Sequence, residues 1–170
     1  MKVTGYKLQQ KLKELEQTRE VLASQFSENM TQFESDTEKV DLLEVFAKYT
    51  ATEKQIAELQ EAQTQYNLGV SVNVLGESMT LQGAVKRVGG AGRSEKMWKD
   101  MVKKGETPRY MVSTERSRNK DSEYARRALS VTEALEHARH ASKVAGALRE
   151  AIQTGNVTEL ELNIDTSLLS

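Results

Sequence analysis

A glycine-rich segment followed by an arginine and a serine is the sharpest candidate for chemistry in this sequence. Residues 89–94 read Gly-Gly-Ala-Gly-Arg-Ser, and Lys96 follows two positions later. Glycines permit close backbone approach, so successive N–H groups at the start of a helix can bind an anion. The spacing differs from that of the G-x-x-x-x-G-K-[ST] loop that holds nucleoside triphosphates. Two interpretations remain open: a phosphate- or carboxylate-binding loop that uses Arg93, Ser94 and Lys96, or a helix C-cap, a turn and an N-cap serine.

A second candidate is the segment 109–127, where arginines are interleaved with tyrosines. Arginine binds phosphate through two parallel hydrogen bonds and tyrosine rings stack on bases, which favours a nucleotide or a nucleic-acid strand. The alternation spreads these side chains over both faces of an expected β-hairpin, so pairing with acidic helices of the same or another subunit is the alternative. The candidate ligand-binding residues here are Arg109, Tyr110, Arg116, Tyr124, Arg126 and Arg127.

A possible metal site consists of Glu133, His137 and His140, which share one face of an expected helix. No further histidine completes the set, so we expect surface or interface histidines and no metal. The sequence has no cysteine, no H-E-x-x-H and no G-x-S-x-G. Ser130 and Ser142, near the histidines, would lie on a helix surface without an oxyanion site. We therefore expect neither catalysis nor a cofactor.

The charge is unevenly distributed along the chain. Residues 86–127 carry thirteen Lys and Arg against six acids, so the net charge of this block is +7. Residues 1–85 hold eight bases against thirteen acids (−5), and residues 128–170 hold three against six (−3). A basic block between acidic segments predicts an anionic ligand or an acidic partner surface.

Length and composition indicate a self-associating protein. A chain of 170 residues suits one compact domain or a small domain with long helical arms. The hydrophobic content of 38% and charged content of 29% are typical of long exposed helices, so we expect a homo-oligomer. The lack of cysteine fits a reducing compartment, and no stretch approaches the roughly 18 apolar residues of a membrane span. We expect a cytoplasmic protein without membrane contact.

The N-terminal third predicts a long helical hairpin. Leucines recur at three- and four-residue steps over about 5–28, with a gap near Arg19 and a cap at Thr4. A second apolar stripe predicts a helix over about 38–66. Alternating valines then predict a short strand over 70–74.

The rest of the chain predicts a mixture of short helices and strands. Two short helices are expected, one ended by Gly89 and Gly90 and one over about 95–104, followed by a basic β-hairpin over about 110–129. Ser130 and Glu133 form a capping box that opens a helix ending near Gly155. The tail over 160–164 alternates like an edge strand. We divide the chain into a helical arm, 1–67, and an α+β region, 68–170, that form one structural unit.

Five short strings along the chain form a recognisable series: Tyr66-Asn67, the strand from Val70 to Val74, residues 76–81 (Gly-Glu-Ser-Met-Thr-Leu), the segment from Arg116 to Leu129, and residues 151–156 (Ala-Ile-Gln-Thr-Gly-Asn). In these strings the sequence resembles a family of small helical bacterial and phage proteins labelled septicolysin-like. The resemblance implies a mixed helical fold and self-association, and it transfers no catalytic residue. The sequence departs from the pattern where residues 86–89 read Lys-Arg-Val-Gly in place of an Arg-Asp pair, and where Val157 replaces an aromatic residue.

Together these features predict an α-rich α+β protein with a long antiparallel helical hairpin, a small sheet carrying a basic hairpin, and a C-terminal helix. The favoured function is non-catalytic binding of an anionic, nucleotide-type small molecule at a basic pocket between subunits of a homo-oligomer. A phage protein that sequesters an immune nucleotide signal is one concrete form, by analogy alone. The first alternative is a structural oligomer without a ligand. The second is a nucleic-acid binder, which the acidic segments disfavour.

Overall fold

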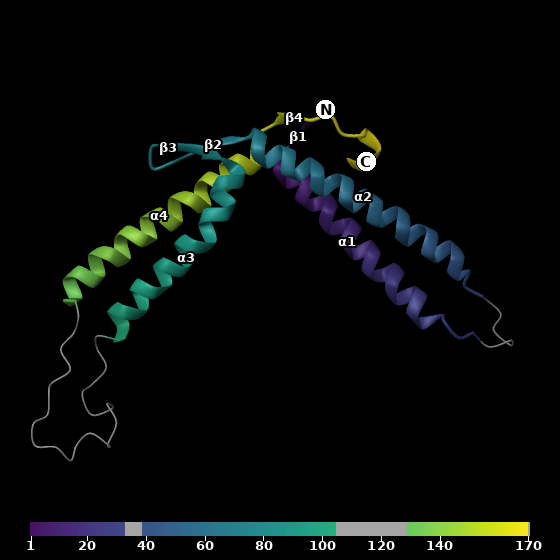
Figure 1. Ribbon diagram of the computed structural model, residues 1–170, viewed down its shortest axis with the longest axis horizontal. Coiled ribbons are helices and arrows are strands. Elements are labelled where there is room, and N and C mark those ends of the chain that lie inside the picture. The colour runs from purple at the N-terminus through teal and green to yellow at the C-terminus, as the bar shows by residue number, and fades with distance from the viewer. Residues whose placement is uncertain (33–38, 105–128, 170) are drawn as a thin grey trace, which may run out of the picture. The chain divides into compact units, whose positions relative to one another are not determined.

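The described part of the chain is mostly helical and forms two compact units. The computed structural model describes residues 1–32, 39–104 and 129–169. Unit 1 comprises residues 1–72, 80–82 and 153–170, and unit 2 comprises residues 73–79 and 83–152. Four α-helices and two small antiparallel sheets make up these residues, so the predicted α-rich α+β class is confirmed (Figure 1).

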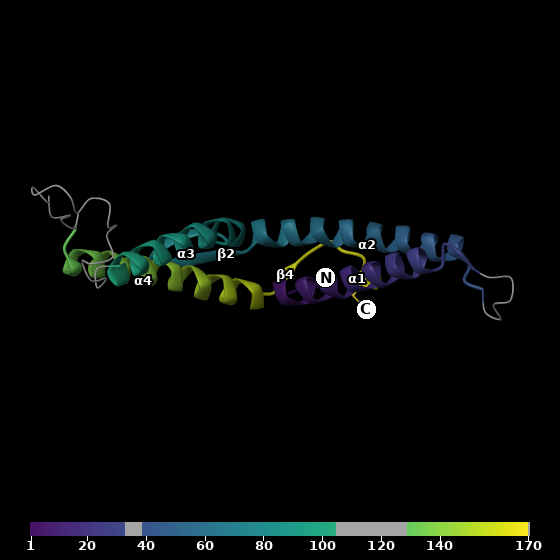
Figure 2. The same ribbon diagram turned by 90° about the horizontal axis from the view of Figure 1, so that it is seen from below.

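A pair of antiparallel helices, α1 (Gly5–Glu28) and α2 (Leu42–Gly69), forms most of unit 1 (Figures 1 and 2). The Thr4 hydroxyl accepts a hydrogen bond from the backbone N–H of Lys7, which confirms the predicted cap. Asp41 caps α2 by accepting from the N–H groups of Leu43 and Glu44. Both helices of the predicted hairpin are therefore present, with α2 beginning four residues later than expected.

The two helices pack along a seam with alternating three- and four-residue steps, as in a coiled coil. Most of its residues are large and apolar, and Leu8 and Leu59 are fully buried. Arg19 occupies the gap in the leucine pattern, and its guanidinium lies 3.7 Å from the carboxylate of Glu53. The seam comprises Gly5, Leu8, Leu12, Leu15, Arg19, Leu22 and Phe26 of α1, and Val45, Tyr49, Thr52, Ile56, Leu59, Gln63 and Tyr66 of α2.

The two chain ends complete unit 1. Strand β1 (Lys2–Val3) pairs antiparallel with β4 (Leu160–Glu161), and a short 3-10 helix, η2 (Thr166–Leu169), follows. The buried Tyr66 hydroxyl donates to the carbonyls of Gly155 and Thr158, at 2.7 and 2.6 Å. Because β4 ends at Glu161, the tail strand predicted over 160–164 is limited to its first two residues.

A tight hairpin joins β2 (Ser71–Val74) to β3 (Glu77–Thr80). Leu75 and Gly76 both have positive φ angles, 53° and 91°, as a two-residue turn that follows the strand twist requires. The side chain of Asn73 accepts from the N–H of Gly76 and stabilises this turn. The strand predicted over 70–74 is confirmed, whereas β3 was not foreseen.

Two further helices, α3 (Leu81–Lys104) and α4 (Val131–Val157), run antiparallel and supply most of unit 2 (Figure 1). Ser130 and Glu133 form the predicted capping box through reciprocal hydrogen bonds. The prediction of two short helices separated by a glycine-rich turn is wrong, because α3 continues through residues 89–94. Each interior glycine costs a helix only about 1 kcal/mol relative to alanine, which packing along α3 offsets. The predicted basic hairpin, 110–129, lies outside the described residues except for Leu129.

Candidate functional site

The α3–α4 hairpin has a seam of small side chains. Its α4 face is mostly alanine, and Ala145 is fully buried. The separation of packed helices depends on the side chains at the contact, so alanines permit a close approach. The seam residues are Ala84, Val88, Ala91, Glu95, Trp98 and Val102 of α3, and Ala134, Ala138, Ala141, Ala145, Leu148 and Ala151 of α4.

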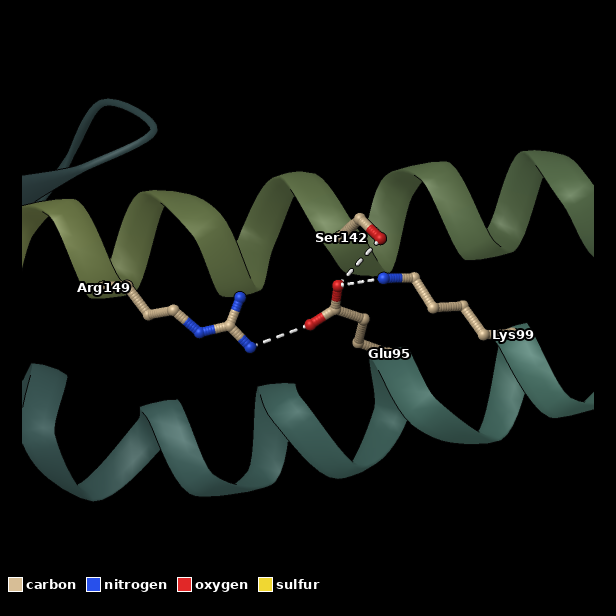
Figure 3. A network of polar contacts seen from close by, with 4 residues as sticks. All are labelled: Glu95, Lys99, Ser142 and Arg149. Atoms are coloured by element: carbon tan, nitrogen blue, oxygen red, sulfur yellow. Dashed lines mark hydrogen bonds and ion pairs between the residues drawn. The ribbon is translucent and has the colours of Figure 1, made fainter.

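Glu95 is the charged residue of this seam, and three side chains hold it (Figure 3). Its Oε1 accepts from the Lys99 ammonium at 2.7 Å and from the Ser142 hydroxyl at 3.0 Å. Its Oε2 accepts from the Arg149 guanidinium at 2.9 Å. The Glu95 side chain is 12% exposed, whereas those of Lys99 and Arg149 are 53% and 54% exposed. We call these four residues the Glu95 clasp.

The hydrogen bonds of the clasp favour the ionised form of Glu95. Hydrogen bonds from Lys99, Arg149 and Ser142 lower the pKa of Glu95 to about 2. The carboxylate is therefore ionised, and its chemical effect is to fix two cations in place. Each of these cations donates one hydrogen bond to Glu95 and is half exposed, so its further N–H groups can bind an oxyanion.

The clasp lies within a larger group of cations that we call the basic face. Steps of three and four residues place Lys96 and Lys103 beside Lys99 on α3, and Arg139 beside Ser142 and Arg149 on α4. Within the described residues no ion pair involves Lys96, Lys103 or Arg139, and all three are exposed. The basic face consists of Lys96, Lys99, Lys103, Arg139 and Arg149, with Glu95 as its carboxylate.

The structure does not bring the three residues of the predicted glycine-rich loop together. Arg93, Ser94 and Lys96 are interior residues of α3, so no helix N-terminus or N-cap serine exists at this point. Successive helix residues are rotated by about 100°, which directs Ser94 and Lys96 to different sides of α3. The Arg93 guanidinium instead lies back along its own helix. Its Nη1 is 3.6 Å from the point that a Cβ would occupy if residue 89 had a side chain. Lys96 alone belongs to the basic face.

The remaining predicted ligand residues stay predictions. Arg109, Tyr110, Arg116, Tyr124, Arg126 and Arg127 lie outside the described residues.

Two of the three possible metal ligands, Glu133 and His137, have other partners. Glu133 accepts from the backbone N–H and the hydroxyl of Ser130, which lowers the pKa of its carboxyl. The His137 ring stacks on Trp98, with ring centroids 4.4 Å apart and 18° between the planes. Among residues 1–32, 39–104 and 129–169, no group of three potential ligands surrounds a metal position.

Sequence reasoning missed the Glu95 clasp, although one signal for it was present. The apolar spacing of α3 continues through residues 88, 91, 95, 98 and 102, and this places Glu95 in the seam. A charged residue at such a position needs partners, and the exposed cations beside it could have been identified as candidates. The serine and arginine on α4 are about 50 residues away, so their proximity is not readable from local spacing.

Unit 1 has a cavity whose lining is acidic, in contrast to the basic face of unit 2. It has a volume of about 220 Å³ and lies between α2 and the C-terminal segment. Glu58, Glu61 and Asp165 are among the residues that line it. These acids disfavour an anionic ligand there.

Comparison with known proteins shows the fold alone. No family profile matches the sequence. No curated protein matches it either. A crystal structure of a conserved, functionally unknown protein from Corynebacterium diphtheriae is similar, with a TM-score of 0.65 over 95% of this chain and 100% of the other. The sequences are 15% identical, so the similarity supports the architecture and carries no function.

Within the described ranges, no helix is sufficiently long and apolar to cross a lipid bilayer.

Proposed function

We propose that this protein is a non-catalytic, homo-oligomeric binding protein for an anionic small molecule of the nucleotide type. The ligand is held by the basic face of α3 and α4 and is enclosed where two subunits meet. Sequestration of a nucleotide signal is the form of this function that we favour.

The observation that supports this proposal is the charge and order of the basic face. Five cations share this face of α3 and α4, and the Glu95 carboxylate fixes two of them, Lys99 and Arg149, in position. Cations held in place lose less conformational entropy on binding an anion than free surface lysines do. Because Lys99 and Arg149 are half exposed, one subunit offers an open surface, and a second subunit would be needed to enclose a small ligand.

The nucleotide character of the ligand rests on sequence. Segment 109–127 follows α3 and contributes arginines and two tyrosines suited to phosphates and bases. Its residues are added to the proposed site only as the sequence-based candidates named above.

Calorimetric titration with AMP, ADP, cyclic AMP and inorganic phosphate tests the proposal. In a triple variant, Lys96→Gln, Lys103→Gln and Arg139→Gln remove three cations that form no ion pair within the described residues. We expect wild-type binding to at least one nucleotide and an affinity at least about tenfold lower in the variant, since each charge-assisted hydrogen bond contributes on the order of 1.5 kcal/mol or more.

Lys13→Gln is the control, because Lys13 is an exposed cation of α1, in unit 1. It removes one charge outside the basic face, and we expect affinity within about twofold of wild type, as for surface changes away from a site. Failure of the wild type to bind any member of the panel contradicts the proposal. Equal losses in the triple variant and in Lys13→Gln would indicate general charge attraction and also contradict it.

Salt dependence separates this proposal from nucleic-acid binding. A duplex binder that covers several phosphates loses orders of magnitude in affinity as salt rises, whereas a site for one or two phosphates loses much less. We expect no retention of duplex DNA at physiological salt in a gel-shift experiment.

A structural oligomer without a ligand is the second candidate. It is favoured by large apolar side chains that one subunit leaves exposed, above all Leu43 at 81% and Met97 at 72%. Its distinguishing outcome is assembly in the absence of any binding to the nucleotide panel.

A further inference from the structure

An exposed aromatic cluster lies near the end of the α1–α2 hairpin in unit 1. The rings of Phe26 and Phe46 have centroids 6.2 Å apart, and those of Phe46 and Tyr49 are 6.5 Å apart and stacked. Phe46 is 56% exposed, Leu43, one turn before it on α2, is 81% exposed, and Met30, just after α1, is 63% exposed, whereas Phe26 and Tyr49 are half-buried. We call these five residues the aromatic patch. Aromatic and Met side chains that remain this exposed are typical of protein interfaces.

The surroundings of the aromatic patch are acidic. The described residues 26–32 and 39–53 carry four acids against two bases, and residues 1–85 carry a net charge of −5. A partner surface for this patch should therefore combine apolar side chains with positive charge. Two aromatic patches facing each other would bring like charges together, which costs free energy.

A surface with those properties lies on α3, on the side away from its seam. Met97 is 72% exposed and Met101 36% exposed, and Lys86 and Arg93 share their side of the helix. Lys86 and Arg93 form no ion pair within the described residues, and Asp100 is the acid on this side. Arg93 Nη2 lies 4.0 Å from the position that a Cβ would take at Gly90, so the guanidinium covers this glycine and adds positive charge to the surface. We call Lys86, Gly90, Arg93, Met97, Asp100 and Met101 the outer face of α3.

We propose that the aromatic patch of one copy of this chain docks on the outer face of α3 of a second copy. Both surfaces are apolar at their centre and they carry opposite charge, and methionine side chains adapt to the shape of aromatic rings. A contact between two different surfaces closes into a dimer when a two-fold axis repeats it and into a ring when another rotation does, so a closed assembly covers both surfaces of every copy. This inference deepens the self-association part of the proposed function and requires no ligand.

A complementation experiment tests the pairing. Leu43→Asp places a charge in the aromatic patch, and Met97→Asp places one on the outer face of α3; both positions are exposed, so neither change disturbs a core. Either variant alone damages both contacts of a symmetric dimer. An equimolar mixture of the two restores one contact between an unaltered patch and an unaltered outer face.

Sedimentation velocity on the full-length chain gives the readout. We expect wild type to form dimers or larger closed assemblies, each variant to sediment as a monomer, and the mixture to recover dimers of lower affinity than wild type. Val21→Asp is the control, because Val21 is 65% exposed on the opposite side of the α1–α2 hairpin; we expect it to assemble like wild type. Circular dichroism of each variant is the folding control, and we expect every variant to retain the helical content of wild type.

Three results would overturn this inference: a monomeric wild type at micromolar concentration, assembly by either variant alone, or a mixture that remains monomeric. The last result would indicate that each surface pairs with itself or with a third surface. Titration of the wild type with the nucleotide panel separates this test from the proposed function. A wild type that binds a nucleotide but remains monomeric would remove the interface and leave the anion site.

Discussion

The two helical hairpins of this chain have seam residues at the same three- and four-residue steps, but the side chains at these positions differ in size. The α1–α2 seam of unit 1 contains leucines, Ile56 and Tyr66, and several of these side chains are fully buried. The α3–α4 seam of unit 2 contains mainly alanines. Large side chains bury more apolar area, and alanines bring helices together with little area. The α1–α2 hairpin should therefore owe its stability to burial, and the α3–α4 hairpin should depend more on specific polar contacts.

The charged residue in each seam strengthens this comparison. In the acidic N-terminal region the seam charge is positive, at Arg19, and in the basic block it is negative, at Glu95. The Arg19 side chain is 34% exposed, and its guanidinium lies 3.7 Å from the Glu53 carboxylate. This geometry is typical of a weak surface ion pair. Glu95 is 12% exposed and accepts three hydrogen bonds. Both seam charges are opposite in sign to the net charge of the surrounding sequence. Glu95 is fixed by three hydrogen bonds, whereas Arg19 forms one long ion pair.

The largest expected effect comes from a cavity in the apolar seam. Leu59→Ala removes a fully buried side chain of α2 and should lower the free energy of unfolding of unit 1 by about 2–5 kcal/mol. Urea denaturation followed by circular dichroism measures the loss. Leu68→Ala, at an exposed position of the same helix, is the control and should change stability by less than about 0.5 kcal/mol. A small effect of Leu59→Ala would show that burial does not dominate in unit 1.

Overfilling the alanine seam should have the next largest effect. Ala145 is fully buried on α4, so Ala145→Leu should force α3 and α4 apart and cost about 1–3 kcal/mol. Ala47→Leu, at an exposed position of α2, adds the same atoms outside any seam and should be nearly neutral. Amide hydrogen exchange locates the effect, because faster exchange is expected in α3 and α4 alone. A variant as stable as wild type would refute close packing between these helices.

The Glu95 clasp makes unit 2 sensitive to acid. The folded pKa of Glu95 is about 2, below the ordinary value of 4.5, so the ionised form favours the folded state. This contribution is complete above pH 4.5 and is lost as pH falls toward about 2. Glu95→Gln should therefore destabilise unit 2 at pH 7, and the difference from wild type should shrink below pH 4.5. Glu136→Gln, at an exposed α4 carboxylate, is the control and should change stability at pH 7 by less than about 0.5 kcal/mol.

The smallest effect is expected at the other seam charge. Arg19→Met keeps much of the apolar stem and removes one exposed pair with Glu53, so stability should change by no more than about 1 kcal/mol. Thermal unfolding at low and high salt measures the change, which should diminish at high salt. A larger loss in Arg19→Met than in Glu95→Gln would reverse the order that the two seams predict.

Local sequence signals predicted much of the fold. Apolar spacing located the α1–α2 hairpin, the box of Ser130 and Glu133 located the start of α4, and valine alternation located β2. These features depend on neighbouring residues, so a single sequence is sufficient to indicate them. The C-terminal segment, which pairs with β1 and packs on Tyr66, depends on contacts between residues far apart in the chain.

The glycines of α3 show why the candidate site was harder to predict. Three glycines within four residues usually mark a turn, and the interpretation as a loop followed from that rule. The seam spacing on both sides continues without interruption through this segment, and packing along it outweighs the weak local preference. The site residues Arg93 and Ser94 were consequently placed at a helix start that does not exist, whereas the cationic character of the region around Lys96 was read correctly from charge alone.

Native mass spectrometry of the protein purified from cells tests the central claim most directly, since it reports the number of subunits and any retained small molecule together. We predict a mass equal to a whole multiple of the chain mass plus a bound small molecule that yields phosphate on fragmentation. The Lys96→Gln, Lys103→Gln and Arg139→Gln triple variant should show the same multiple without the bound molecule. The account would be contradicted by a wild-type spectrum that shows a single chain and no bound molecule, together with no binding to any nucleotide of the panel.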